Sequence, residues 1–225
     1  MARASKIPPK RLDMALAEGL PTPVAGVDEA GRGPWAGPLV AAAVMLAEGA
    51  APEGLDDSKR IAPRRRETLA AALEALAAEG GAAIGIAVVE AAEIDRIGLG
   101  PANDAALCRA VAALGDGPLG LPAGLVIDGR RLPPALNLPA RAITGGDGLV
   151  SAIAAASILA KVTRDRMMDA LDARHPGYGW STNRGYGTAG HSEALARLGP
   201  CPQHRRSFRP VARVAEERAL GRAQI

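Results

Sequence analysis

The sequence predicts an α/β fold, in which short apolar strands alternate with longer helical segments. Residues 39–46 and 83–89 are apolar runs of strand length, and two shorter runs, at 24–27 and 125–128, lead into a carboxylate. Pro63 begins a helical segment that ends before Gly80-Gly81, and a proline at the start with a glycine after the end is typical of helices. A chain of 225 residues is expected to form one domain.

The other elements follow in chain order. Helices are predicted at 63–79, 91–97, 102–114, 148–173 and 189–198. Loops are predicted at 48–59 and 176–188, and residues 133–142 should form a loop followed by a short strand. Small residues in the long helix, among them Ala154 and Ser157, predict that it packs closely on a sheet.

Charge is unevenly distributed along the chain. The net charge is +3, but the basic groups concentrate at the two ends, and the residues between them are net acidic. We expect residues 1–23 to form a basic N-terminal arm and residues 212–225 a basic C-terminal tail. Basic ends around an acidic centre suit an enzyme that binds a polyanion and holds metal with its acids. The alternative is that the many arginines reflect biased codon usage.

Cysteine content and hydropathy indicate the compartment. Cys108 and Cys201 are the only cysteines, which gives no disulfide framework and fits a reducing environment. No apolar region of a signal peptide follows the basic N-terminus, and the longest apolar segment, 149–160, is shorter than a bilayer requires. We therefore predict a cytoplasmic protein without a membrane span.

Two adjacent carboxylates, Asp28 and Glu29, end the first predicted strand, and glycines and prolines follow them. Carboxylates that repel each other and lose hydration are tolerated when a divalent cation neutralises them. The two can share one ion only if the backbone turns between or just after them, because successive strand side chains point to opposite faces. The alternative is a charged turn between two strands.

Two further carboxylates follow the same logic. Asp128 ends a short strand before Gly129, and Asp147 precedes the long helix, where it could instead be the N-cap. Four carboxylates, Asp28, Glu29, Asp128 and Asp147, could hold two Mg²⁺ or Mn²⁺ ions and support phosphodiester hydrolysis. The three histidines lack the spacing of a zinc site.

Ordered motifs give these acids a context. They are Asp28-Glu29-Ala30-Gly31-Arg32-Gly33, Asp57-Ser58-Lys59, Ile127-Asp128-Gly129, Gly146-Asp147, residues 154–165, Gly185-Tyr186-Gly187-Thr188 and residues 204–208. In this order they resemble bacterial ribonuclease HII, the type 2 ribonuclease H, from about residue 24 to 211. The resemblance implies a ribonuclease H-like fold, with a mixed five-stranded sheet flanked by helices and a helical C-terminal extension, and a catalytic domain over residues 24–211.

The resemblance also implies an activity. It is hydrolysis of RNA in RNA–DNA hybrids, and cleavage 5′ of a single ribonucleotide in duplex DNA, by a metal-dependent endonuclease that leaves 3′-hydroxyl and 5′-phosphate ends. The four carboxylates would then be both catalytic and metal-binding, in a monomer for which contact with a sliding clamp is a further hypothesis. Two alternatives stay open: a junction-resolving or integrase-like nuclease of the same fold, and a metal-free nucleic-acid-binding module.

Substrate contacts are implied residue by residue. The backbone of Gly31-Arg32-Gly33 would contact the ribose 2′-hydroxyl, which distinguishes RNA from DNA. The ring of Tyr186 would stack on the following sugar, with Tyr178 as a rival and a core position as the alternative for either. Phosphate contacts are expected from three cations, each of which could equally be a solvated charge: Lys59, Lys161 and Arg184. Relatives often have lysine in place of Arg184.

Other polar residues receive simpler expectations. Arg205, Arg206, Arg209 and Arg213 lie close in sequence and could follow a duplex backbone. His191 and His204 match positions of the family, and we expect hydrogen-bonded structural histidines there rather than proton shuttles. Asp165, between two arginines, is expected to be a surface or helix-pair charge.

Overall fold

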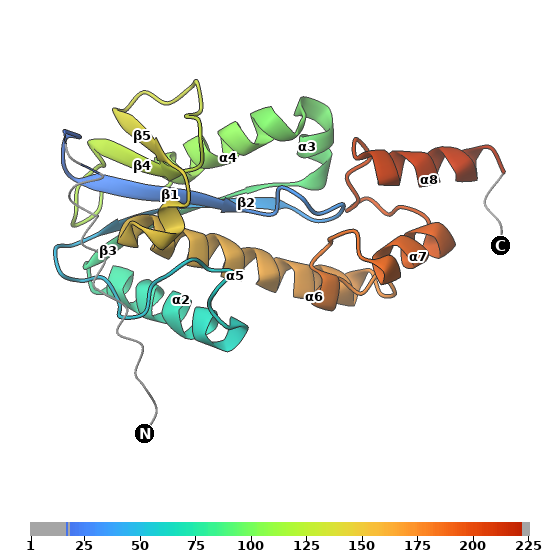
Figure 1. The fold of residues 1–225 in the computed structure, drawn as a ribbon, viewed down its shortest axis with the longest axis horizontal. Coiled ribbons are helices and arrows are strands. Elements are labelled where there is room, and N and C mark those ends of the chain that lie inside the picture. The colour runs from blue at the N-terminus through green and yellow to red at the C-terminus, as the bar shows by residue number, and fades with distance from the viewer. Residues whose placement is uncertain (1–16, 18, 222–225) are drawn as a thin grey trace.

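A mixed five-stranded sheet forms the centre of the computed structural model, which describes residues 17 and 19–221 (Figure 1). The strands are β1 (Val24–Ala30), β2 (Leu39–Leu46), β3 (Ala82–Val89), β4 (Gly124–Asp128) and β5 (Ala140–Ile143). Their order is β3-β2-β1-β4-β5. The pairs β1–β2 and β2–β3 are antiparallel, whereas β1–β4 and β4–β5 are parallel. The mixed sheet predicted from the resemblance is confirmed.

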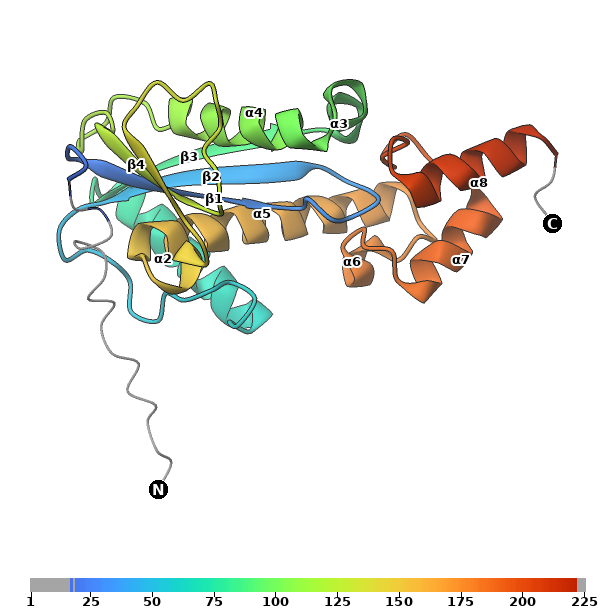
Figure 2. The ribbon, with the colours of Figure 1, turned by 45° about the horizontal axis from the view of Figure 1, so that its top comes forward.

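Helices cover both faces of this sheet. On one face lie α2 (Pro63–Ala78) and α5 (Ser151–Arg174), and on the other lie α3 (Ala91–Ile97) and α4 (Leu99–Ala112) (Figures 1 and 2). A 3-10 turn, η1 (Gly146–Gly148), precedes α5. The C-terminal helices α6 (Trp180–Asn183), α7 (Ala189–Leu198) and α8 (Arg209–Ala219) lie beyond one end of the sheet.

The packing of β1 determines where its side chains point. Ala25 and Val27 belong to the core between the sheet and α4, so the alternate residues of β1 face α5. A Cβ at Gly26 would lie 2.2 Å from the carbonyl carbon of Ala152. The close packing predicted for the small residues of the long helix is therefore confirmed, and it brings α5 directly over the end of β1.

The structure differs from the predicted elements mainly at their ends. The first strand continues through Ala30, so the turn follows the acidic pair rather than separating it. Helix α4 begins at Leu99 because Gly98, with φ 85°, is sufficient to separate it from α3.

Two helices, α6 and α8, arise where a loop and a basic tail are predicted. The division into an arm at 1–23, a domain at 24–211 and a tail at 212–225 stays a prediction, and most of the arm lies outside the described residues. Among the helices that are described, none is long and apolar enough to cross a membrane.

Candidate active site

Asp28 and Asp128 follow directly after the last residue pair of the parallel strands β1 and β4. The register of β1 and β4 pairs Val27 with Ile127, so the aspartates are the next residues along both strands. Val27 and Ile127 face the core beneath α4, and both aspartates therefore project toward α5. The N–H of Gly146 donates to Oδ1 of Asp128 at 2.8 Å, which places the turn η1 beside this pair.

Asp28 is almost completely enclosed, with 6% of its surface exposed. Burial raises the pKa of its carboxyl well above the usual value, and the nearby carboxylates of Glu29 and Asp128 raise it further. A hydrogen bond with Ser157 of α5 acts in the opposite direction. The Ser157 hydroxyl also lies 2.9 Å from the Ser58 hydroxyl, from which it can accept a hydrogen bond, and this links Asp28 to the loop before α2.

Glu29 follows Asp28 within a continuous strand, so the two side chains begin on opposite faces of the sheet. Burial raises the pKa of Glu29, against the effect of Arg32, and the carboxylate of Asp128 raises it again. Nη1 of Arg32 lies 3.4 Å from Oε1 of Glu29. The side chains of Asp28 and Glu29 therefore start on opposite faces of β1 and do not bind a single ion together from one face.

Asp147 lies in η1 rather than at the cap of the long helix. Its Oδ1 accepts the N–H of Gly148 at 2.9 Å, whereas the N-cap of α5 is Val150. The expectation that Asp147 caps this helix is wrong, because the 3-10 turn separates it from the helix by several residues. Burial raises the pKa of Asp147, and the carboxylates of Asp57 and Asp128 raise it further, so Asp147 lies in the same acidic cluster.

Lys59 provides a positive charge next to these acids. Burial alone would lower its pKa, but the carboxylates of Asp147, Asp57 and Asp28 outweigh this and raise it. The N–H of Lys59 donates to Oδ1 of Asp57 at 2.8 Å, which fixes the turn that carries both side chains. Asp57, which sequence reasoning did not treat as a site residue, thus belongs to the cluster, and the Asp57-Ser58-Lys59 motif was its signal.

The donor set fits a hard divalent cation. Mg²⁺ and Mn²⁺ prefer oxygen ligands such as carboxylates. The crowding that raises the pKa values of these acids would be relieved by a bound cation, which favours their ionised forms. Within the described part of the chain, however, no three His, Cys, Asp or Glu side chains are placed to hold one ion together. Coordination therefore requires at least one carboxylate to rotate toward Asp28 and Asp128.

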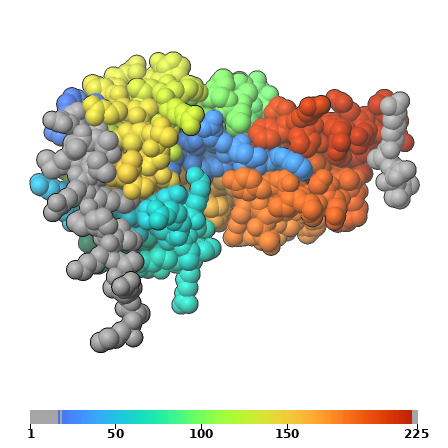
Figure 3. Space-filling view, in the orientation of Figure 1, coloured from blue at the N-terminus to red at the C-terminus, as the bar shows by residue number. Residues whose placement is uncertain are grey.

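The predicted ribose-binding segment lies in the turn after β1, where Arg32 and Gly33 are exposed and Gly31 is buried. Figure 3 shows this blue part of the chain on the surface, between the yellow segment around β5 and the orange and red C-terminal helices. Gly31 has φ 99°, and a Cβ at Gly33 would lie 3.4 Å from the ring of Tyr186. Tyr186 is 47% exposed. Two segments far apart in sequence thus meet here.

Tyr178 is not placed to stack on a substrate sugar, the role for which it was the alternative to Tyr186. It is buried, its hydroxyl donates to the carbonyl of Gly199 at 2.7 Å, and its ring stacks on Trp180. Tyr178 is therefore a core ring with a satisfied hydroxyl.

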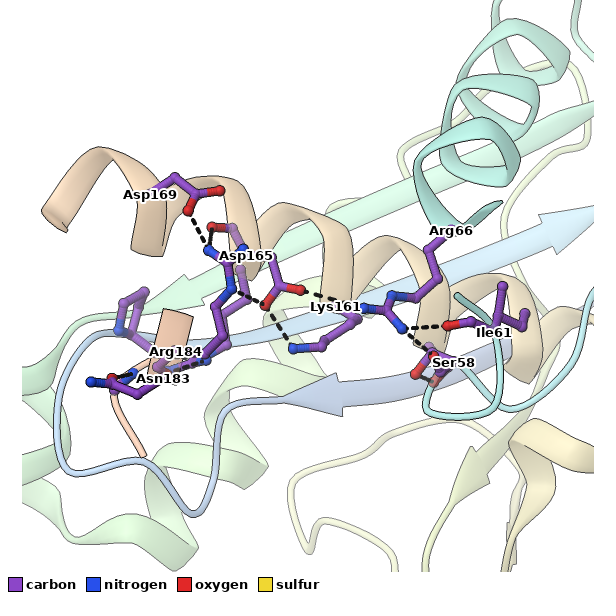
Figure 4. A network of polar contacts seen from close by, with 12 residues as sticks. Ser58, Ile61, Arg66, Lys161, Asp165, Asp169, Asn183 and Arg184 are labelled. Carbon is purple, nitrogen blue, oxygen red and sulfur yellow. Dashed lines mark hydrogen bonds and ion pairs between the residues drawn. The ribbon is translucent and has the colours of Figure 1, made fainter. Parts of the chain in front are cut away.

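Lys161 and Arg184, both expected to contact phosphate, pair with carboxylates along one face of α5 (Figure 4). Nζ of Lys161 donates to Oδ1 of Asp165 at 2.7 Å, and Arg184 pairs with Asp165 and Asp169. Arg66 completes the network: Nη2 lies 3.9 Å from Asp165, and Nη1 donates to the carbonyl of Ser58 at 2.8 Å. Asp165 is thus the centre of a network that joins the loop before α2 to the loop before α7.

Arg205 does not lie on the surface. It is fully buried, so the expectation that it follows a duplex backbone is wrong, whereas Arg206, Arg209 and Arg213 are exposed. Its guanidinium donates to main-chain carbonyls of the turn after β1. Their spacing in the sequence groups the four arginines, but in the structure one of them is buried and three are exposed.

His191 and His204 are buried and contact each other through their rings. Nε2 of His191 lies 3.2 Å from Nε2 of His204, Nδ1 of His191 lies 2.9 Å from the carbonyl of Tyr186, and Trp180 donates to His191 at 3.1 Å. Burial lowers the pKa of His204 to about 4. The expectation of hydrogen-bonded structural histidines is confirmed, and His191 supports the loop that carries Tyr186.

Comparison with known proteins agrees with this geometry. The model of the Ribonuclease HII family matches residues 25–211. The chain is 54% identical to Ribonuclease HII of Rhizorhabdus wittichii over 192 residues, which cover 85% of this chain and 90% of that protein. It is 50% identical to Ribonuclease HII of Cereibacter sphaeroides over 205 residues, which cover 91% and 92%.

The fold has similar solved relatives. The crystal structure of the ribonuclease H2 from Pyrococcus horikoshii OT3 matches with a TM-score of 0.70 and 27% identity, over 86% of this chain and 97% of that one. Because the family match spans the sheet, the acidic cluster and the helices up to the start of α8, this chain belongs to the ribonuclease HII family and is a nuclease.

Proposed function

We propose that the chain is a metal-dependent endoribonuclease that hydrolyses RNA in RNA–DNA hybrids and cuts on the 5′ side of a single ribonucleotide in duplex DNA. The products would carry 3′-hydroxyl and 5′-phosphate ends. The observation that carries the proposal is the register of β1 and β4, which sets Asp28 beside Asp128 with η1 next to them. Membership of the family supports the class of substrate.

Asp28, Glu29, Asp128 and Asp147 are the proposed ligands of two divalent ions, Mg²⁺ or Mn²⁺. Such ions, when bound, align a water molecule and stabilise charge on the phosphate and on the departing oxygen. The chain itself holds Asp28 and Asp128 on the face of the sheet that is turned toward α5 and keeps Lys59 beside them, where an ammonium group can attract the substrate phosphate.

Selection of RNA is assigned to the turn after β1. Backbone N–H groups of Gly31, Arg32 and Gly33 would bind the 2′-hydroxyl, and the exposed ring of Tyr186 would stack on the next sugar. The N–H groups of these three residues donate to no other described residue, and two of the three residues, Arg32 and Gly33, are exposed. Phosphate contacts by Lys161 and Arg184 would require each to leave or share Asp165.

The remaining assignments are predictions of the same proposal. Exposed Arg209 and Arg213 would contact phosphates of the duplex away from the cleavage site. The protein is expected to act as a cytoplasmic monomer, and contact with a sliding clamp is a further hypothesis.

Two assays test the proposal against its rivals. Incubation with Mg²⁺ or Mn²⁺ should degrade the RNA of a hybrid and leave an all-DNA four-way junction intact, whereas a junction-resolving enzyme would cut the junction. Calorimetric titration with Mn²⁺ should show specific uptake that is lost in Asp128→Asn. A metal-free binding module would bind hybrid without cleavage and show no such uptake.

A further inference from the structure

Two arginines are buried beneath the turn after β1 without a carboxylate partner. Arg164 is 1% exposed and Arg205 fully buried, and neither forms an ion pair with any described residue. Burying a charge is costly unless polar groups replace its hydration. In this structure, main-chain carbonyl groups do so.

Arg205 binds the turn from the side of the C-terminal helices. Its Nη2 donates to the carbonyl of Gly31 at 2.6 Å, and its Nη1 donates to the carbonyl of Arg32 at 3.0 Å. Nε and Nη2 both donate to the carbonyl of Gly37, at 3.0 and 2.9 Å. One guanidinium thus fixes both ends of the turn.

Arg164 binds the same turn from α5. Its Nε donates to the carbonyl of Pro38 at 2.9 Å, and Nη2 donates to that of Ala36 at 3.3 Å. Nη1 donates to the carbonyl of Arg184 at 3.0 Å, in the loop that carries Tyr186. A Cβ at Gly31 would lie 2.1 Å from Nε of Arg164, so glycine is required for this contact.

The direction of the peptide groups follows from these bonds. The carbonyls of Gly31 and Arg32 are directed toward the guanidinium of Arg205, so the N–H groups of Arg32 and Gly33, which belong to the same two trans peptide groups, point the opposite way. The N–H groups of residues 31–33 have no acceptor in the described chain. Farther along the turn, the N–H groups of Trp35 and Gly37 donate to Gly185 and Gln203, at 2.8 and 2.9 Å. The turn and the Tyr186 loop are therefore held as one unit.

We infer that Arg164 and Arg205 are positioning residues for ribose recognition, which orient the peptide groups of residues 31–33 and the ring of Tyr186 toward the sugar of the ribonucleotide. The inference rests on the proposed function of the turn. Neither arginine touches the substrate, and both act through the backbone that they bind. Lysine cannot replace them, because one ammonium group lacks the planar set of donors that a guanidinium directs at several carbonyls.

The test uses Arg164→Lys and Arg205→Lys with two matched controls. Arg166→Lys changes an exposed arginine of α5 that pairs with Glu67 and Glu74. Arg218→Lys changes an exposed arginine that, like Arg205, donates to main-chain carbonyls, those of Ala196 and Arg197, but away from the turn.

The first readout is preference for ribose. Affinity is measured with Ca²⁺ in place of a catalytic metal, for a DNA duplex that holds one ribonucleotide and for the all-DNA duplex of the same sequence. The ratio of the two dissociation constants should fall about fivefold or more in Arg164→Lys and Arg205→Lys, the effect of at least one lost hydrogen bond. Affinity for all-DNA duplex should not change, and both controls should keep the wild-type ratio.

The second readout is independent of substrate. Amide hydrogen exchange at Trp35 and Gly37 should be slow in the wild type and faster in Arg164→Lys and Arg205→Lys. An unchanged ratio, or an equal loss of affinity for both duplexes, would overturn the inference.

The two readouts also separate this inference from the proposed function. If wild-type protein shows no preference for ribose, the proposed function fails, and exchange alone decides whether the arginines hold the turn. Unchanged exchange would show that they do not. If Arg205→Lys does not fold, Arg164→Lys decides, because it binds the turn at other carbonyls.

Discussion

Replacing Asp28 by Asn should abolish cleavage and stabilise the metal-free fold at neutral pH. Asp28 is buried next to the carboxylates of Glu29 and Asp128, so its ionised form is unfavourable when no cation is bound. Asparagine has nearly the same volume and carries no charge. The variant therefore lacks a metal ligand, and it also lacks the charge that is repelled by the neighbouring carboxylates.

The geometry sets the size of this cost. Neighbouring strands lie about 4.8 Å apart. Two like charges at roughly 5 Å, with an effective dielectric constant of about 20, repel by about 3 kcal/mol. Partial protonation of the acids and rotation of their side chains reduce this, so we expect Asp28→Asn to gain about 1 to 2 kcal/mol in free energy of unfolding.

The sign of the pH dependence follows from the raised pKa of Asp28. A carboxyl whose folded-state pKa lies above its unfolded value destabilises the fold above the folded pKa, and this effect disappears as pH falls below the unfolded value. The advantage of Asp28→Asn should therefore be present at pH 7.5 and shrink on acidification.

Thermal unfolding with EDTA and with Mn²⁺ provides the assay. In EDTA the variant should melt roughly 2 to 8 °C above the wild type, from about 2 to 4 °C per kcal/mol for a protein of this size. Mn²⁺ should raise the melting temperature of the wild type and of the exposed control Asp116→Asn, but not of Asp28→Asn. A variant that melts below the wild type in EDTA, or gains equally from Mn²⁺, would refute the reasoning.

Four further predictions follow from other parts of the structure. Asp147→Asn should reduce cleavage, with partial recovery as Mn²⁺ is raised. Its melting temperature in EDTA should not fall, because Asp147 does not cap α5 and its charge lies among other carboxylates; full activity with lost stability would contradict this. Tyr186→Ala should reduce cleavage at single ribonucleotides more than it reduces duplex affinity, whereas Tyr186→Phe should retain most activity, and equal effects would argue against stacking. Replacing Arg209 and Arg213 by Ala should weaken binding to hybrid and plain duplex alike and lower the salt slope by about one unit per lost contact; a shifted cleavage site would count against backbone contacts. Burial lowers the pKa of His204 from 6.5 to about 4, so the fold should lose roughly 3 kcal/mol of stability as the pH falls between these values. Urea unfolding over this pH range should show a smaller loss of stability for His204→Gln than for the wild type.

Much of the sheet could be predicted because its strands are apolar runs bounded by glycine and proline. The acids Asp28 and Asp128 could be placed at strand ends for the same reason. Their adjacency could not be predicted from either strand alone, since it depends on the parallel pairing of β1 with β4, which are separated by two other strands and three helices.

The errors have a common physical cause. Local sequence offers an N-cap as the alternative role of Asp147, because an acid before a helix resembles a cap, and predicts a surface position for Arg205, because clustered arginines resemble a phosphate-binding surface. In the fold, the 3-10 turn η1 moves Asp147 away from the helix end, and the turn after β1 buries Arg205 beneath its carbonyls. Burial of a polar residue by a distant segment leaves no signal in its own sequence neighbourhood.

Cleavage of a DNA duplex that holds one ribonucleotide tests the central claim most directly. The wild-type protein with Mg²⁺ or Mn²⁺ should cut once, on the 5′ side of that ribonucleotide, with 3′-hydroxyl and 5′-phosphate ends when products are resolved to the nucleotide. The all-DNA duplex should remain intact. Cleavage on the 3′ side, a 2′,3′-cyclic phosphate product, or equal cutting of the all-DNA duplex would contradict the account.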